Sequence, residues 1–164
     1  MLDRHIHPRL KPLLHRCVSI IDKPAITPDG LTLVGFAIGV LALPFLALGW
    51  YLAALAVIVL NRLFGGVDGA LACRRGLTDA GGFLDITRDF LFYALVPFGF
   101  MLADPAANSL AGGWLLFAFM GTGSSFLAFA ALAAKHQIDN PGYAHKSFYY
   151  LGGLTEGTET ILLF

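Results

Sequence analysis

Long apolar segments without charged side chains constrain the fold of this chain more than any other feature. Residues 31–48 carry no Asp, Glu, Lys or Arg, and a helix of about 20 such residues crosses the hydrocarbon core of a bilayer. Hydrophobic residues make up 57% of the 164 residues, charged residues make up 13%, and the mean hydropathy is +0.71. This composition is too apolar for a soluble domain of this size and predicts an all-α polytopic membrane helix bundle.

About five segments are long and apolar enough to span the bilayer. We expect them at residues 31–48, 51–68, 83–103, 109–134 and 147–164, the second of them becoming polar in its second half. Short turns are expected between them at 49–51 and 104–108. Small residues at 121–125, in the centre of the fourth segment, are expected to allow close approach of a neighbouring helix.

The N-terminal residues have a different pattern. Between residues 2 and 21, apolar side chains recur every three or four positions with basic residues between them. This period predicts an amphipathic interfacial helix, interrupted by Pro8 and Pro12, and a disordered basic tail is the alternative. The domain organisation is then an interfacial segment at 1–23 followed by one transmembrane domain at 24–164.

The positions of the 11 basic residues indicate how the chain is oriented. None lies in the turns at 49–51 and 104–108, whereas the N-terminus, the Arg74–Arg75 turn and the loop after Lys135 are basic. The positive-inside rule predicts that these basic parts face the cytosol. The expected location is the inner or cell membrane. Cys17 and Cys73 would then lie where thiols stay reduced, so no disulfide is expected. The chain is expected to contact membrane lipid and is not expected to bind nucleic acid.

Three aspartates interrupt the apolar sequence. Asp68 precedes Gly69, and Asp85 and Asp89 are spaced i,i+4, which places both on one helical face. Carboxylates at this depth are costly and indicate a functional site. Such an oxygen cluster suits Mg²⁺ or Mn²⁺, which in turn suits a phosphate-bearing substrate. The alternative is a salt-bridge network of these aspartates with Arg62 and Arg88.

The spacing of these residues resembles a known signature. The CDP-alcohol phosphotransferases, membrane enzymes with six spanning helices, carry D-x2-D-G-x2-A-R, about eight residues, and then G-x3-D-x3-D. The matching positions are Asp68–Gly69, Ala72, Gly81, Asp85 and Asp89. Similarity extends upstream to 26–32 and downstream to a polar helix with Glu156 and Glu159, whose role stays open.

The resemblance implies a reaction and a set of roles. A phosphatidyl or other substituted phosphate group would pass from a CDP-linked lipid donor, CDP-diacylglycerol, to a small alcohol acceptor, and CMP would leave. Asp68, Asp85 and Asp89 would bind metal, in a two-metal site, and Asp89 would also be the catalytic base. The residues implied in substrate binding are Asp29, Thr32, Gly69, Arg74, Thr78, Gly81 and Lys146.

Several of these roles have simpler alternatives. Turn or N-cap chemistry accounts equally well for Asp29 and Thr78. Gly69 and Gly81 could serve close helix contact instead of substrate approach. A lysine at the membrane interface, such as Lys146, is commonly one that extends its amine to water.

Departures from the signature limit what the resemblance implies. Gly65 stands where the family has its first aspartate, Cys73 stands where it has an arginine, and the spacer before Gly81 is one residue short. A second metal should therefore bind poorly, and Gly65→Asp with Cys73→Arg is expected to raise metal affinity or rate. A family member that binds nucleotide without turnover is one alternative function, and a small cation transporter is another. A homodimer is expected, as is a C-terminally shortened form with five spanning helices.

Overall fold

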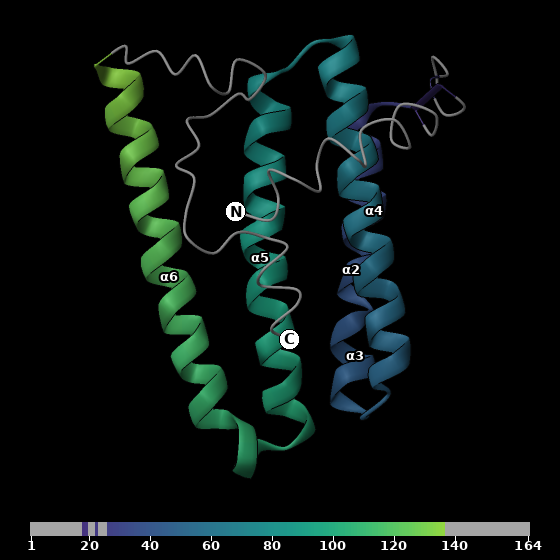
Figure 1. The fold of residues 1–164 in the computed structure, drawn as a ribbon, viewed down its shortest axis with the longest axis vertical. Coiled ribbons are helices and arrows are strands. Elements are labelled where there is room, and N and C mark those ends of the chain that lie inside the picture. Colours follow the sequence, from purple (N-terminus) through teal and green to yellow (C-terminus); the bar gives the residue numbers. More distant parts are fainter. Residues whose placement is uncertain (1–17, 20–21, 23–25, 137–164) are drawn as a thin grey trace, which may run out of the picture.

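The chain forms a bundle of long helices in the computed structural model, which describes residues 18, 19, 22 and 26–136 (Figure 1). Within those residues, four helical segments are long and apolar enough to cross a membrane. They are α2 with α3 (Pro28–Val40 and Ala42–Ala47), α4 (Tyr51–Arg75), α5 (Asp79–Ala103) and α6 (Pro105–Lys135). The predicted all-α membrane bundle is confirmed. The predicted helix at 147–164 and nearly all of the predicted interfacial helix lie outside the described residues.

The first spanning segment begins earlier than expected and is broken. Thr27 caps α2, because its Oγ1 accepts a hydrogen bond from Gly30 N at 3.1 Å. The helix then breaks at Leu41, between α2 and α3. The cause is Pro44, which has no N–H to donate to the carbonyl of Val40 and whose ring crowds that carbonyl. The predicted span at 31–48 is confirmed, but it consists of two helices and not one.

The second and third spanning helices meet at the turn before Thr78. α4 runs unbroken from Tyr51 through its polar half to Arg75, and it is followed by the C-cap Gly76, whose φ of +106° suits a residue without a side chain. α5 begins at Asp79, four residues before its predicted start. The reason is the Thr78 cap, in which Oγ1 accepts from Gly81 N at 3.0 Å.

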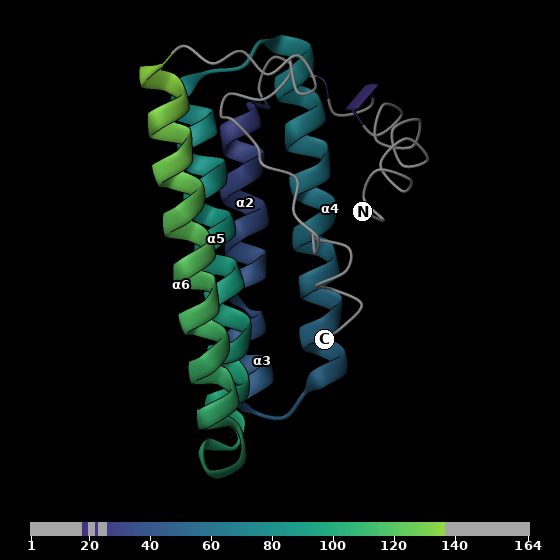
Figure 2. The same ribbon diagram turned by 60° about the vertical axis from the view of Figure 1, so that its left-hand side comes forward.

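The predicted turn at 104–108 is shorter than expected, because only Asp104 separates α5 from α6. Asp104 Oδ1 accepts a hydrogen bond from Ala107 N at 3.0 Å, and Pro105 occupies the first helical position, where its missing N–H has no cost. α6 then packs along α5, as both ribbon views show (Figure 2).

Glycines allow α2 to approach α4 and α5 closely. A Cβ at Gly35 would lie 2.6 Å from Phe64 Cβ, and one at Gly39 would lie 2.6 Å from Asn61 Nδ2 and 2.8 Å from the ring of Phe92. Side chains larger than hydrogen are therefore excluded from these two positions. Such small-residue contacts are typical of helices that associate in lipid, where apolar burial alone provides little driving force.

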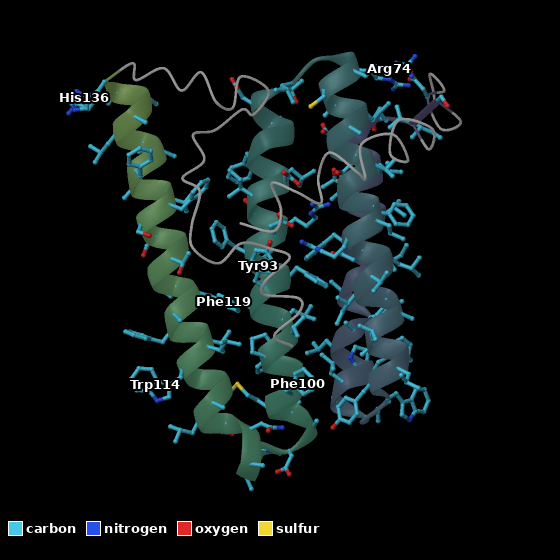
Figure 3. All side chains as sticks on the ribbon, viewed as in Figure 1. Arg74, Tyr93, Phe100, Trp114, Phe119 and His136 are labelled. Carbon is cyan, nitrogen blue, oxygen red and sulfur yellow. The ribbon has the colours of Figure 1, made fainter. Side chains whose placement is uncertain are left out.

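The basic turn and the aspartates lie toward the same end of the bundle. The N-terminal ends of α2 and α5 meet the C-terminal end of α4 there, and α6 ends there too (Figure 1). Arg74 and His136 lie at this end, whereas Phe100 and Trp114 lie near the opposite one (Figure 3). Asp68 and Asp85 are each about two helical turns below it.

Candidate functional site

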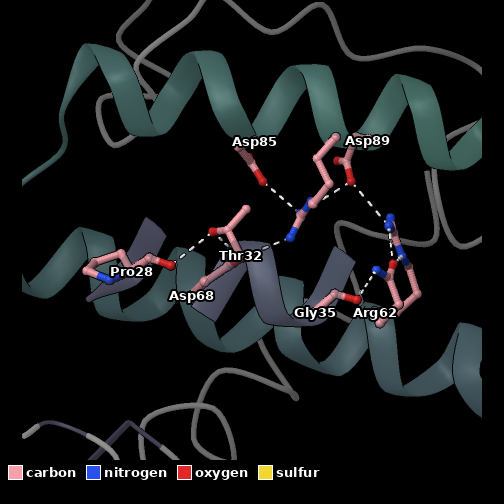
Figure 4. A network of polar contacts seen from close by, with 9 residues as sticks. Pro28, Thr32, Gly35, Arg62, Asp68, Asp85 and Asp89 are labelled. Carbon is pink, nitrogen blue, oxygen red and sulfur yellow. Dashed lines mark hydrogen bonds and ion pairs between the residues drawn. The ribbon is translucent and has the colours of Figure 1, made fainter. Parts of the chain in front are cut away.

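The three aspartates converge on the guanidinium of Arg88. Arg88 Nη1 lies 3.0 Å from Asp68 Oδ2, and Nη2 lies 2.8 Å from Asp85 Oδ1 and 3.3 Å from Asp89 Oδ1 (Figure 4). Arg88 is 5% exposed and Asp68 is 3% exposed. The expected meeting of carboxylates from α4 and α5 is thus present, and an arginine lies at the point where they meet.

The local sequence explains why Arg88 fits between them. On α5, Asp85, Arg88 and Asp89 are spaced i, i+3 and i+4, so all three project toward α4. On α4, Gly65 lies one turn before Asp68, and a Cβ at Gly65 would be 3.1 Å from Arg88 Nη2. The absence of a side chain at Gly65 therefore leaves the space that the guanidinium occupies.

The third helix of the site contributes Thr32. Its Oγ1 lies 2.6 Å from Asp68 Oδ2 and 3.0 Å from Pro28 O, and its one hydroxyl proton is shared between these two acceptors. Thr32 is buried, so in this structure it holds Asp68 in place. Its expected contact with the donor stays a prediction.

Asn61 and Arg62 form a polar pair next to the cluster. Asn61 was not predicted, whereas Arg62 was named with Arg88 in the salt-bridge alternative, and the structure shows that network. Asn61 is fully buried; its Nδ2 donates to Gly35 O at 2.8 Å, and its Oδ1 accepts from Arg62 Nη2 at 2.6 Å. Arg62 Nη2 also lies 3.2 Å from Asp89 Oδ1, and its guanidinium stacks over Phe92 at 4.8 Å. The signal that could have found Asn61 is its place next to an arginine inside an apolar helix.

Three predicted substrate contacts lie together where α2 and α5 begin. A Cβ at Gly81 would be 2.9 Å from Thr78 Oγ1 and 3.1 Å from Asp29 Oδ1. Thr78 is the N-cap of α5, which was its alternative role. Asp29 lies in the first turn of α2, where Thr27 is the cap, so the N-cap alternative for Asp29 is wrong.

The remaining predicted positions differ in what the structure says of them. No described atom comes within 4 Å of a Cβ at Gly69, so close contact with a described helix does not account for this glycine. Arg74 is largely exposed, and its Nη1 lies 3.3 Å from Asp22 Oδ2, away from the aspartates. Cys73 is also exposed. Lys146, Glu156 and Glu159 lie outside the described residues.

The arrangement does not fit a metal ion between the aspartates. In the described part of the chain, no three His, Cys, Asp or Glu side chains are placed to hold one. The reason is visible in the cluster, where the carboxylate oxygens of Asp68, Asp85 and Asp89 face the nitrogens of one guanidinium (Figure 4). The expected Mg²⁺ or Mn²⁺ stays a prediction.

The fold and the site define a class: a helical membrane protein with an acidic cluster between two neighbouring spanning helices. The model of the CDP-alcohol phosphatidyltransferase family matches residues 25–151, which is most of the sequence, and the chain belongs to this family. This confirms the resemblance.

Three curated proteins are similar to the chain. It is 87% identical over 164 residues to "Inner membrane protein YnjF" of Escherichia coli, covering all of the chain and 80% of that protein. It is 32% identical over 160 residues to an uncharacterized protein of Aquifex aeolicus, covering 97% of the chain and 76% of that protein. It is 36% identical over 98 residues to the archaetidylinositol phosphate synthase of Pyrococcus horikoshii, covering 59% of the chain and 52% of that protein. No solved structure matches the chain.

Proposed function

We propose that the chain transfers a phosphatidyl group from CDP-diacylglycerol to the hydroxyl of a small alcohol and releases CMP. The observation that carries this proposal is the convergence of Asp68, Asp85 and Asp89 from α4 and α5, at the spacing of the family signature. The long apolar helices support a lipid-linked donor, because its acyl chains can remain in the bilayer while its phosphates reach the cluster.

The reaction assigns Asp89 the role of general base. The alcohol oxygen attacks the lipid-bearing phosphorus, the bond from that phosphorus to the bridging oxygen breaks, and CMP leaves with the electron pair. The alcohol proton passes to Asp89. The Asp89 side chain is 32% exposed whereas that of Asp68 is 4% exposed, so an acceptor can reach Asp89 more easily. Within residues 26–136, both hydrogen bonds of Asp89 go to Oδ1, which leaves Oδ2 for the proton.

Arginines are the groups in this cluster that can bind the phosphates. The guanidinium of Arg62 or Arg88 can form two parallel hydrogen bonds with phosphate oxygens and carries a permanent charge. Two further features lie on the helices that carry the cluster, toward the end of the bundle. They are the open space beside Gly69 and the contact of Asp29, Thr78 and Gly81. We assign these four residues to the nucleotide.

The orientation and assembly are part of the proposal. Arg74, Arg75 and Lys135 lie at the ends of α4 and α6 that share one side of the bundle, which supports a cytosolic location for that side. The name of the Escherichia coli relative supports an inner membrane location. We keep the homodimer as a prediction.

The test is CMP release from CDP-diacylglycerol by the protein in lipid nanodiscs. The acceptor panel contains inositol phosphate, glycerol phosphate and serine, with inositol phosphate first because the Pyrococcus relative is named as an archaetidylinositol phosphate synthase. Asp89→Asn should abolish release, and Asp79→Asn is the matched control, because Asp79 is an exposed aspartate at the start of the same helix. Loss of activity in both variants, or in neither, would contradict the role of Asp89.

A binding protein without turnover is the second candidate. The observation that favours it is that Arg88 engages all three aspartates at once. This candidate predicts saturable binding of CDP-diacylglycerol with no CMP release for any alcohol in the panel.

A further inference from the structure

We propose that Arg88 is a built-in cation that takes the place of one divalent metal ion, so that the site binds the donor's pyrophosphate without metal at that position. This inference rests on the proposed function for the identity of the ligand. Its structural part, the exclusion of metal by Arg88, stands on the contacts within the cluster alone.

The first support is the position of the guanidinium. It is bonded to the oxygens of Asp68, Asp85 and Asp89 at 3.0, 2.8 and 3.3 Å, and these are the three side chains that the signature would assign to metal. A cation already lies at their common point. A divalent ion could bind there only if the guanidinium moved out of a buried position.

The second support is Gly65, which lies against the same guanidinium. A Cβ at Gly65 would be 3.1 Å from Arg88 Nη2. Relative to a cluster with an aspartate at 65 and an uncharged residue at 88, the present pair changes the local charge by about two positive units, the charge of one divalent cation. The two positions therefore complement each other in space, and together they supply the charge of the ion that is replaced.

The third support is an unused donor. Arg88 Nε is buried and has no hydrogen-bond partner among the described residues. A buried donor without a partner is costly in a protein interior. A phosphate oxygen of CDP-diacylglycerol can accept a hydrogen bond from this N–H, and guanidinium groups commonly bind phosphate in this way.

A purely structural ion pair explains these observations less well. Buried ion pairs contribute little net stability compared with apolar residues of similar volume, because both charges must be desolvated. A cluster of three carboxylates and two guanidiniums inside an apolar bundle is therefore expected to have a binding role.

The experiment is a titration of Mn²⁺ into the purified protein in nanodiscs, with free Mn²⁺ measured by electron paramagnetic resonance. Wild type should bind no Mn²⁺ at the cluster. Arg88→Gln should gain one site, and Gly65→Asp with Arg88→Gln should bind at least about tenfold more tightly, because an anionic ligand is added. Arg75→Gln is the matched control, since Arg75 pairs with Asp22 outside the cluster, and it should behave as wild type.

Thermal unfolding gives a second readout that does not require turnover. Mn²⁺ should raise the Tm of Arg88→Gln, because the ion replaces the missing cation, and should leave the Tm of wild type unchanged. If Arg88→Gln can be purified only in the presence of Mn²⁺, that supports the proposal equally. Mn²⁺ binding by wild type that Asp85→Asn abolishes would overturn it, and so would a folded Arg88→Gln that gains no site.

Activity measurements separate this inference from the proposed function. Wild type should release CMP in excess chelator, whereas the double variant should require Mn²⁺. If no donor and alcohol support CMP release in any variant, the proposed function fails while the Mn²⁺ titration still decides the role of Arg88. If wild type releases CMP only with Mn²⁺ bound through Asp85, the proposed function holds and the role of Arg88 fails.

Discussion

Polar side chains find their hydrogen-bond partners in different ways in two regions of the bundle. These regions are the junction of α2, α4 and α5 and the centre of α6. At the junction they bond across helices, as Thr32 does to Asp68 and Asn61 to Gly35 O. In α6, hydroxyls bond to the carbonyls of their own helix, as Thr122 does to Ala118 O and Ser124 to Met120 O.

The difference shows how much each region depends on its neighbours. Every polar group in a bilayer needs a partner. A hydroxyl finds one in its own helix, so α6 can satisfy Thr122 and Ser124 alone. A carboxylate or guanidinium requires an opposite charge, and at the junction two of these pairs, Asp68 with Arg88 and Arg62 with Asp89, join α4 to α5. The cluster therefore determines how α2, α4 and α5 pack, whereas the polar residues in the centre of α6 do not determine its position.

The largest effect is expected for Arg88→Ala. Removing the guanidinium leaves three carboxylates without their shared cation, and breaking a buried ion pair in this way costs about 3–5 kcal/mol. Chemical unfolding in the same detergent measures the loss. Lys135→Ala, at the end of α6, is the control and should differ little from wild type. Similar stability of the two variants would mean that the cluster does not hold the junction together.

Glycine replacements should affect the junction and α6 differently. Gly39→Ala should destabilise by about 1–3 kcal/mol, because its Cβ would overlap Asn61 and Phe92. Gly121→Ala, in α6, has no described atom within 4 Å of the new Cβ and should be neutral or stabilising by up to about 1 kcal/mol, since alanine favours helix. Thermal unfolding of both variants tests this, and equal losses would contradict it.

A smaller effect is expected for Thr32→Val. The substitution keeps the volume but removes the hydroxyl that donates to Asp68, which should cost about 1 kcal/mol of stability. CMP release should fall as well, because Asp68 is then less firmly held. An unchanged rate together with the lower stability would limit Thr32 to a structural role.

The smallest effect is expected for Ser124→Ala. Its hydroxyl bonds only to carbonyls of its own helix among the described residues, so the change should lie within about 0.5 kcal/mol. A loss as large as that of Thr32→Val would show that the centre of α6 meets a partner that the hydrogen bonds of α6 do not reveal.

Local features explain how far the fold and the site could be predicted from sequence. The apolar lengths predicted the four described spans, because a helix must be about as long as the bilayer is thick. Helix ends were less accurate, since Thr78 and Asp104 cap helices that begin several residues before their apolar parts. The predicted close approach of a helix at 121–125 is seen at one glycine and not at the other. A Cβ at Gly123 would lie 2.9 Å from Phe90, whereas no described atom lies within 4 Å of a Cβ at Gly121.

The membrane-bundle class and the acidic cluster could be inferred from the sequence, because apolar length and the i,i+4 spacing of Asp85 and Asp89 depend only on the order of residues. The sequence left two partners open for these aspartates, a metal ion or the guanidiniums of Arg62 and Arg88, and the packing of the helices shows the guanidiniums. Arg88 is one residue from Asp89, yet its reach to Asp68 depends on the packing of α5 against α4 and on the space left by Gly65. Pairing across helices is set by distances between elements, which local periodicity does not specify.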